Sequence, residues 1–161
     1  MKDVSLNSNN TMKKLLLTLI SIGTIVLSSN AQSPVVLSQR AQAEVIDQWL
    51  EERIQTVLPE IMEREGIDMW LVMSREYNED PVIRTFLPAT WFAARRRTML
   101  LIYKPQGTEK VEALAVARYD VGKAFKKAWD PEAEPDQWKK LAELIKERNP
   151  NIIAVNIGKD Y

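Results

Sequence analysis

The amino-acid sequence predicts an α/β fold in which a mixed sheet is flanked by helices. A helical stripe of apolar residues comes first, between Ala41 and Glu65, and a continuous apolar run from Met69 to Met73 follows it. Two more strand patterns are joined by a short turn, and a second helix and a last strand come after them. Helices and strands therefore alternate along the chain, and such an order is typical of α/β layers.

The first helix is predicted from apolar residues that recur every three or four positions from Ala41 to Glu65. Pro59 lacks a backbone N–H, so we expect it to kink this helix or to divide it near Leu58. Gly66 follows the last periodic residue, where a left-handed cap is easily adopted by glycine. The helix is therefore expected to end at that glycine.

Three strands are predicted in the middle of the chain. The run Met69 to Met73 is too short for a helix and is expected to be a strand that is buried on both faces. The patterns at 98–104 and 111–118 flank the turn 105–107. A connection this short favours an antiparallel hairpin.

The last third of the chain is expected to hold two helices and a strand. The pattern from Val121 to Trp129 indicates a short amphipathic helix, and Asp136 is expected to cap a longer one that stops at Asn149 and Pro150. Residues 152–157 have the pattern of a strand, after which the sequence soon stops. Strand and helix units of this kind usually continue, so we expect the domain at 41–161 to be incomplete at its C-terminal end.

Residues 1–31 have the features of a secretory signal peptide. Lys13 and Lys14 precede 13 uncharged residues, and small residues at Ser29 and Ala31 favour cleavage after Ala31. A membrane anchor is the alternative, but a spanning helix needs about 20 apolar residues. We therefore expect an exported protein, periplasmic or secreted, with no stable membrane anchor. A linker at 32–40 would precede the domain, and Met12 is a second candidate start.

The composition excludes several classes of function. The 161 residues include no Cys and no His, so Ser-His and Cys-His nucleophile pairs and imidazole metal ligands are absent. The chain by itself is therefore not expected to be an enzyme or to hold a cofactor. Its 22 basic and 22 acidic residues cancel, which gives no reason to expect a nucleic-acid partner.

The loop after the first strand is one candidate site, because ligands of open α/β sheets collect beyond the carboxyl ends of strands. It contains Arg75, Glu76 and Tyr77, followed by Glu79 and Asp80. The three carboxylates could bind a hard cation or exchange protons with a substrate. The alternative is a solvated loop in which Asp80 caps a short helix at 82–86.

The run Arg95, Arg96 and Arg97 is a second candidate, since Trp91 and Phe92 precede it. Arginines beside aromatic rings can clamp a carboxylate or stack on a base. The alternative is a solvated lead into the next strand, with one structural ion pair.

Tryptophan is a third candidate feature, with five residues of this type in the chain. Three of them fall on predicted core faces, namely Trp49, Trp70 and Trp138. Trp91 and Trp129 lie near predicted loops, where an exposed aromatic ring could contact a partner.

The sequence resembles the N-terminal domain of the creatinase and Xaa-Pro aminopeptidase family, in particular its exported bacterial members. The likeness spans about residues 41–161 and is carried by Glu65-Gly66-Ile67-Asp68, by the strand Met69 to Met73, by the loop Ser74 to Pro81 and by Ala94 to Leu101. The loop Ser74-Arg75-Glu76-Tyr77-Asn78-Glu79-Asp80-Pro81 is its most distinctive part.

The resemblance implies a two-domain parent protein. Its C-terminal domain would bind two divalent metal ions and hydrolyse an Xaa-Pro bond, while the N-terminal domain would support homo-oligomer contacts and wall the active site. Arg75, Glu76, Tyr77, Trp91 and Arg95 to Arg97 are the candidate contacts to substrate or subunit. Two alternatives remain: a self-standing periplasmic binding or scaffold domain, and a metal-dependent enzyme that uses only the loop carboxylates.

Overall fold

The computed structural model describes residues 13, 14, 16 and 36–157. The chain divides into two compact units, Met1–Val36 and Leu37–Tyr161. In the first unit residues 13, 14 and 16 are helical, and the predicted cleavage site at Ala31 lies outside the described residues. No helix in the described ranges combines the length and the apolar character of a membrane span.

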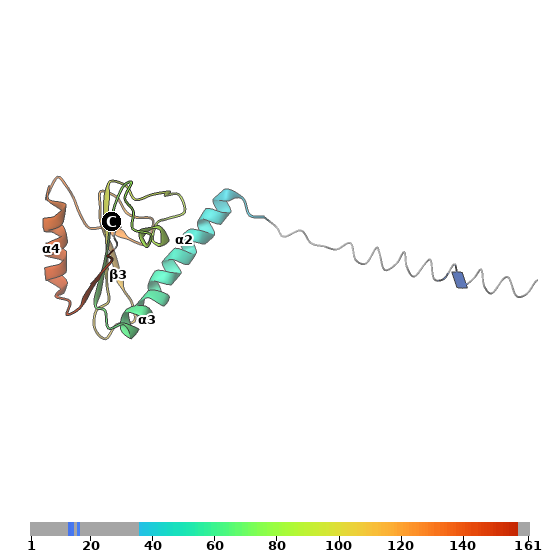
Figure 1. The fold of residues 1–161 in the computed structure, drawn as a ribbon, viewed down its shortest axis with the longest axis horizontal. Helices are drawn as coiled ribbons and strands as arrows, with labels where there is room; N and C mark the ends of the chain where they lie inside the picture. The colour runs from blue at the N-terminus through green and yellow to red at the C-terminus, as the bar shows by residue number, and fades with distance from the viewer. Residues whose placement is uncertain (1–12, 15, 17–35, 158–161) are drawn as a thin grey trace, which may run out of the picture. The chain divides into compact units, whose positions relative to one another are not determined.

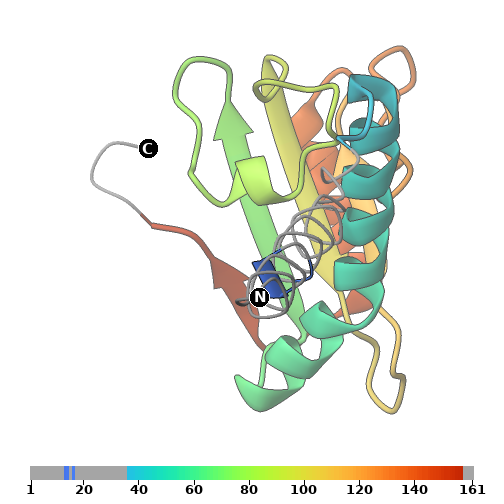
Figure 2. The same cartoon turned by 90° about the vertical axis from the view of Figure 1, so that its right-hand side faces the viewer.

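A mixed sheet forms the centre of the second unit, as the sequence predicts. Its strand order is β4-β3-β2-β1-β5, which Figure 2 shows nearly face on. Strand β2 (Arg97–Tyr103) is antiparallel to both β1 (Met69–Arg75) and β3 (Glu112–Val116). The two edge strands are parallel to their neighbours: β5 (Ile153–Val155) to β1, and β4 (Lys126–Lys127) to β3. The predicted hairpin is therefore confirmed.

Helices cover both faces of this sheet (Figure 1). Because side chains alternate along a strand, Val72 and Leu100 pack towards the first helices, while Leu71 and Leu101 face the last one. All four side chains are buried. The sheet is thus buried on its two faces, with a separate apolar cluster on each.

The first helix is divided, close to the predicted position. Helix α2 (Gln39–Gln55) is capped by Ser38, whose hydroxyl accepts a hydrogen bond from the backbone N–H of Ala41. Helix α3 (Val57–Arg64) follows after Thr56. Pro59 lies in the first turn of α3, where its missing N–H has no intrahelical partner to lose. Gly66 ends α3 with φ at +67°, as expected for a left-handed cap.

The last helix matches its prediction at both ends. Helix α4 (Gln137–Arg148) begins at Asp136, whose carboxylate accepts hydrogen bonds from the backbone N–H groups of Trp138 and Lys139. It ends at Asn149, which adopts the left-handed conformation. Arg148 then binds the two carboxylate oxygens of Glu112 on β3, at 2.5 and 2.7 Å. The hydrogen bonds to Glu112 raise the pKa of the Arg148 side chain.

The predicted helix from Val121 to Trp129 is wrong. Val121 and Phe125 instead pair as an antiparallel bridge, with reciprocal backbone hydrogen bonds of 3.0 and 3.3 Å, and the chain continues into β4. Gly122 has φ at +61°, which a helix interior does not allow. Val121, Phe125 and Trp129 are all buried. A tight turn can therefore bury residues at the same four-residue intervals as a helix, which explains why the pattern suggested a helix.

Asp80 links the loop after β1 to Asn156, the residue that follows β5. Its side chain is 0% exposed and accepts a hydrogen bond of 2.8 Å from the backbone N–H of Val82, at the start of the 3-10 helix η1 (Ile83–Thr85). It also accepts a hydrogen bond from the Asn156 amide, whose oxygen accepts one of 2.8 Å from Trp70 Nε1. A short helix does follow Asp80, but it is of the 3-10 type and spans Ile83–Thr85. Its cap residue is Val82, with no side-chain hydrogen bond at the cap, so Asp80 binds the backbone just before the helix and does not cap it.

Candidate functional site

Three of the loops that carry candidate residues meet at one end of the sheet. β1 and β3 both run antiparallel to β2. The end of β1, the start of β2 and the end of β3 therefore lie side by side, and the start of α4 reaches the same place. The topology thus brings together segments that are up to about 60 residues apart in the sequence.

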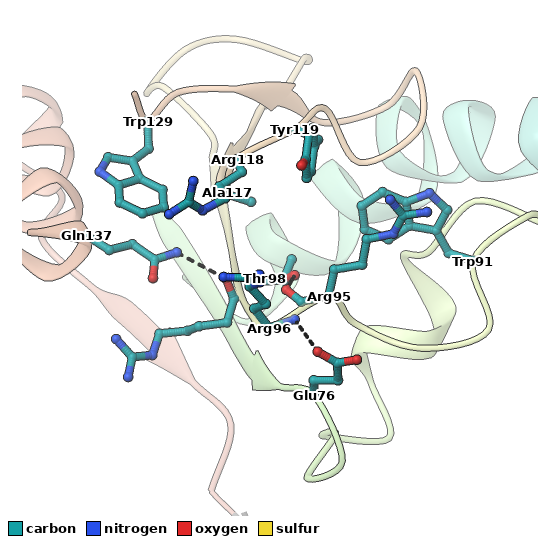
Figure 3. Close-up of a pocket in the computed structure, with 11 residues that line it drawn as sticks. Glu76, Trp91, Arg95, Arg96, Thr98, Ala117, Arg118, Tyr119, Trp129 and Gln137 are labelled. Carbon is teal, nitrogen blue, oxygen red and sulfur yellow. Dashed lines mark hydrogen bonds between the residues drawn. The ribbon is translucent and has the colours of Figure 1, made fainter. Parts of the chain in front are cut away.

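A cavity of about 610 Å³ opens at this end of the sheet, and we call it the arginine pocket. Its volume lies within the ~300–1,000 Å³ range of small-molecule sites. Figure 3 shows the side chains around it. The pocket is lined by Glu76, Trp91, Arg95, Arg96, Arg97, Thr98, Ala117, Arg118, Tyr119, Trp129 and Gln137.

Two arginines of this pocket lie against tryptophan rings. The guanidinium carbon of Arg95 is 4.5 Å from the ring centroid of Trp91, and that of Arg118 is 5.9 Å from the ring of Trp129 (Figure 3). The face of a tryptophan ring attracts a positively charged group, and the resulting contact limits the positions that the guanidinium group can adopt. The two arginines are thus held at separate places on the rim.

Buried polar groups fix the floor of the pocket. The amide of Gln137 donates hydrogen bonds to the carbonyl of Arg97 on β2 at 3.1 Å and to that of Val116 on β3 at 2.6 Å. The Trp129 ring is 8% exposed, and its N–H donates a bond of 2.7 Å to the carbonyl of Glu134. The two bonds of Gln137 fasten the start of α4 to the sheet, and the third bond holds the Trp129 ring against the segment before α4.

The loop after β1 is joined to the lead into β2 by a reciprocal pair of hydrogen bonds. The backbone N–H of Glu76 donates to the carbonyl of Arg96 at 2.5 Å, and the backbone N–H of Arg96 donates to the Glu76 carboxylate at 3.1 Å. Arg96 and Tyr77 both have positive φ, at +52° and +68°. The junction between the loop after β1 and the lead into β2 therefore contains two residues in a backbone region that glycine normally occupies, and Arg96 is the one that lines the pocket.

The predicted site residues divide between the pocket and its surroundings. Glu76, Trp91 and Arg95 to Arg97 line it, whereas Arg75 and Tyr77 do not. Arg75 lines a smaller hollow beside Trp138, and the Tyr77 side chain is 93% exposed. The Arg97 side chain extends towards α4, where its guanidinium carbon lies 5.4 Å from the Trp138 ring. Arg97 is therefore among the residues that line the pocket, while its guanidinium group lies beside α4.

The loop carboxylates do not form a cation site. Glu76 is bonded to Arg96, and Asp80 is turned inward towards Asn156. Within the described ranges, no three His, Cys, Asp or Glu residues are grouped so that they could hold a metal ion.

Two tryptophans expected in the core are half exposed, and one expected near the surface is buried. Trp49 is 60% and Trp138 49% exposed, while Trp129 is 8% exposed and Trp70 packs against the core. In α2 and α3 the buried stripe follows a strict four-residue spacing: Leu50, Ile54, Leu58 and Met62. Trp49 lies outside that narrow stripe, although its own spacing also fits a helical face.

The pocket also contains residues that the sequence reasoning missed, chiefly Arg118, Tyr119 and Gln137. The predicted hairpin carried a signal for the first two. The end of one hairpin strand must lie beside the start of the other, which places Arg118 near Arg95. Gln137 gave no such signal, because its place depends on how α4 docks on the sheet.

Asp120 follows the pocket residue Tyr119 and secures the chain at β4. Its carboxylate accepts a hydrogen bond of 2.7 Å from the backbone N–H of Lys127 and lies 3.5 Å from the Lys126 ammonium group. The hydrogen bond from Lys127, followed by the charges of Lys126 and Lys127, lowers the pKa of Asp120 below its ordinary value of 3.8. The ionised form of Asp120 thus favours the folded state.

Asp120→Asn is expected to weaken the pH dependence of the free energy of unfolding in the acidic range. A carboxylate whose pKa is lowered on folding stabilises the protein above its unfolded pKa, and this contribution is lost as the pH falls through the folded pKa. Urea unfolding should show that the stability gap between parent and variant narrows between about pH 6 and about pH 2.5. A gap that is constant across this range would contradict the role given to Asp120.

Comparisons of this chain with protein-family models, with curated proteins and with solved structures found no match in any of the three.

Proposed function

We propose that this chain is the non-catalytic N-terminal domain of an exported Xaa-Pro aminopeptidase-like metallopeptidase. In this role it supports subunit contacts and forms part of the wall of an active site whose two divalent metal ions belong to another domain. The proposal begins from the sequence likeness at residues 41–161. It agrees with the mixed sheet and flanking helices that the likeness implies.

The observation that carries the proposal is the apolar edge of the sheet at β5. Ile152, Ile153, Val155 and Ile157 are all 40% or more exposed, and no strand among the described residues pairs with the outer side of β5. The opposite edge, β4, consists of Lys126 and Lys127, which protect it by charge. An uncharged, apolar edge is the kind that another domain or subunit covers. A domain of a larger assembly explains this difference between the two edges.

The exposed surface formed by α2 and the start of α3 supports the proposed subunit contacts. Ile46, Trp49 and Val57 are each at least 46% exposed and line a shallow hollow of about 440 Å³. Exposed tryptophan beside aliphatic side chains is typical of interface centres. We assign this surface to a homo-oligomer contact.

The arginine pocket supports the proposal that this domain forms part of the wall of an active site. It presents charged and aromatic side chains on loops that rigid strands and a helix hold in place. Such a surface can orient a substrate while groups of a neighbouring domain act on the reacting bond.

The test is to isolate the native protein from its own cells with an antibody against residues 41–157. Its mature mass and first residues should show cleavage after Ala31 and a polypeptide much longer than residues 32–161. The same preparation should hydrolyse a peptide with Xaa-Pro at its N-terminus. A chelator should abolish this activity, and added Mn²⁺ should restore it.

A short mature polypeptide that cleaves no Xaa-Pro peptide with any added divalent metal would refute the peptidase assignment. The second candidate, a self-standing periplasmic binding or scaffold domain, is favoured by the arginine pocket itself. A monomeric native protein that binds a small ligand and lacks hydrolase activity would select this candidate.

A further inference from the structure

The arginine pocket has more positive charge than its own residues neutralise. Four arginines line it, and Glu76 is its one carboxylate among the lining residues. The guanidinium group of Arg97 lies at the Trp138 ring, which leaves Arg95, Arg96 and Arg118 for the pocket. None of these three arginines forms an ion pair with any residue in the described part of the chain. One Glu76 oxygen is already bonded to the backbone of Arg96. With three positive groups and one negative group, the pocket has an excess of 3 − 1 = 2 positive charges.

Two of these guanidinium groups are positioned in advance for a ligand. Arg95 and Arg118 each lie near a tryptophan ring, and the Trp129 ring is buried and hydrogen-bonded to the carbonyl of Glu134. A stacked guanidinium keeps its N–H edge free, and that edge can donate two parallel hydrogen bonds to a carboxylate or a phosphate. Little side-chain freedom then remains to be lost when a ligand binds.

The remaining walls of the pocket are aromatic. Tyr119 and Trp91 stand on the same rim as the arginines (Figure 3). Aromatic walls would contact the apolar or flat body of an organic molecule, which inorganic ions lack. The combination of two unneutralised charges, stacked guanidinium groups and aromatic walls defines one chemical class of ligand.

We propose that the arginine pocket binds a small organic dianion, with its carboxylate or phosphate groups on Arg95 and Arg118 and its body against Trp91 and Tyr119. This site does not depend on the peptidase assignment. It would serve a wall of an active site and an independent binding domain equally well, so the two proposals can fail separately.

The experiment uses the full-length native protein and two probes that bind metal ions weakly. Phthalate carries two carboxylates on an aromatic ring, and phenyl phosphate carries one doubly charged phosphate on a similar ring. Each is titrated by isothermal calorimetry against a sodium chloride control of equal ionic strength, because screening by salt weakens all exposed charges. Thermal unfolding with and without each probe gives a second measure of binding.

We expect saturable one-to-one binding of at least one probe, together with a rise in the melting temperature. The probe that binds more tightly distinguishes a carboxylate ligand from a phosphate ligand. Arg95→Gln and Arg118→Gln should each weaken the binding about tenfold, as loss of a charge-assisted hydrogen bond predicts. Their melting temperatures without probe should stay close to that of the parent, since both side chains are exposed and each loses only one contact with a tryptophan ring.

Arg84→Gln is the matched control. Arg84 is an exposed arginine of η1, lies outside the pocket and forms no ion pair among the described residues. Its replacement should leave the affinity unchanged. Absence of saturable binding for both probes would overturn the proposal, and so would an equal loss of affinity in Arg84→Gln. Binding without Xaa-Pro hydrolysis would leave this site standing and refute the peptidase assignment alone.

Discussion

Phe125→Ala is expected to lower the free energy of unfolding by about 3–5 kcal/mol, the usual cost of removing a buried aromatic side chain. Phe125 is 0% exposed and meets the ring of Phe86 edge to face, with their centroids 5.7 Å apart. Phe86 in turn meets Trp70 edge to face at 5.6 Å. The substitution therefore leaves a cavity and also removes one of the two contacts that join these three aromatic rings.

Urea unfolding followed by tryptophan fluorescence measures this effect. Phe92→Ala is the control, because Phe92 is 94% exposed and its loss should change the stability by less than about 0.5 kcal/mol. Phe125→Leu keeps most of the buried volume and should be clearly more stable than Phe125→Ala. Equal stabilities of Phe125→Ala and Phe92→Ala would contradict the bridge between Val121 and Phe125 and the burial that follows from it.

Asp80→Ala is expected to destabilise the protein by about 2–4 kcal/mol, through two losses in one side chain. The backbone N–H of Val82 loses its acceptor at the start of η1. Asn156 loses the partner of its amide N–H₂ group while it still holds the Trp70 N–H. Both donors are half-buried, so water replaces the lost acceptor only in part, and each loss costs more than an exposed hydrogen bond would.

Asp80→Asn separates these two losses. An asparagine oxygen can accept the hydrogen bond from Val82, but its N–H₂ group would then face the N–H₂ group of Asn156. We expect a stability between those of the parent and of Asp80→Ala, measured by urea unfolding. Glu79→Ala removes a neighbouring carboxylate and should have a small effect, within about 0.5 kcal/mol. If Glu79→Ala lowered the stability as much as Asp80→Ala does, the effect would come from the charge of the loop and not from the contact with Asn156.

Local signals in the sequence were sufficient where a few adjacent residues decide the structure. Asp136 caps α4 because its side chain reaches N–H groups two and three positions ahead. The hairpin of β2 and β3 follows from a short turn between two apolar runs. In both cases the partners are close in sequence, so the pattern alone predicts the fold.

The sequence was insufficient where the partner lies far along the chain. The apolar positions of Val121, Phe125 and Trp129 fit a helix, and only their contacts with the sheet and with Phe86 select a turn. Trp49 likewise fits a helical face that the sheet does not reach. In each case tertiary packing overrides a local pattern that two structures share.

The arginine pocket shows the same division. The run Arg95 to Arg97 beside Trp91 was recognisable as a cationic and aromatic segment. The second half of the pocket, with Arg118 and Trp129, comes from the other hairpin strand and the segment before α4. Cation–π pairs and hydrogen bonds between these segments depend on the sheet, which no single stretch of sequence contains.

The positive φ angles of Arg96 and Tyr77 imply that these two positions, in the lead into β2 and in the loop after β1, keep their side chains at a cost in stability. An ordinary residue in the left-handed region costs on the order of 1 kcal/mol, and glycine would remove that cost. Glycine at either position would therefore make the fold more stable and the surface emptier, because Arg96 and Tyr77 would lose their side chains. Selection for thermal stability alone favours glycine at both positions, whereas selection for binding in the arginine pocket would retain Arg96, which lines it.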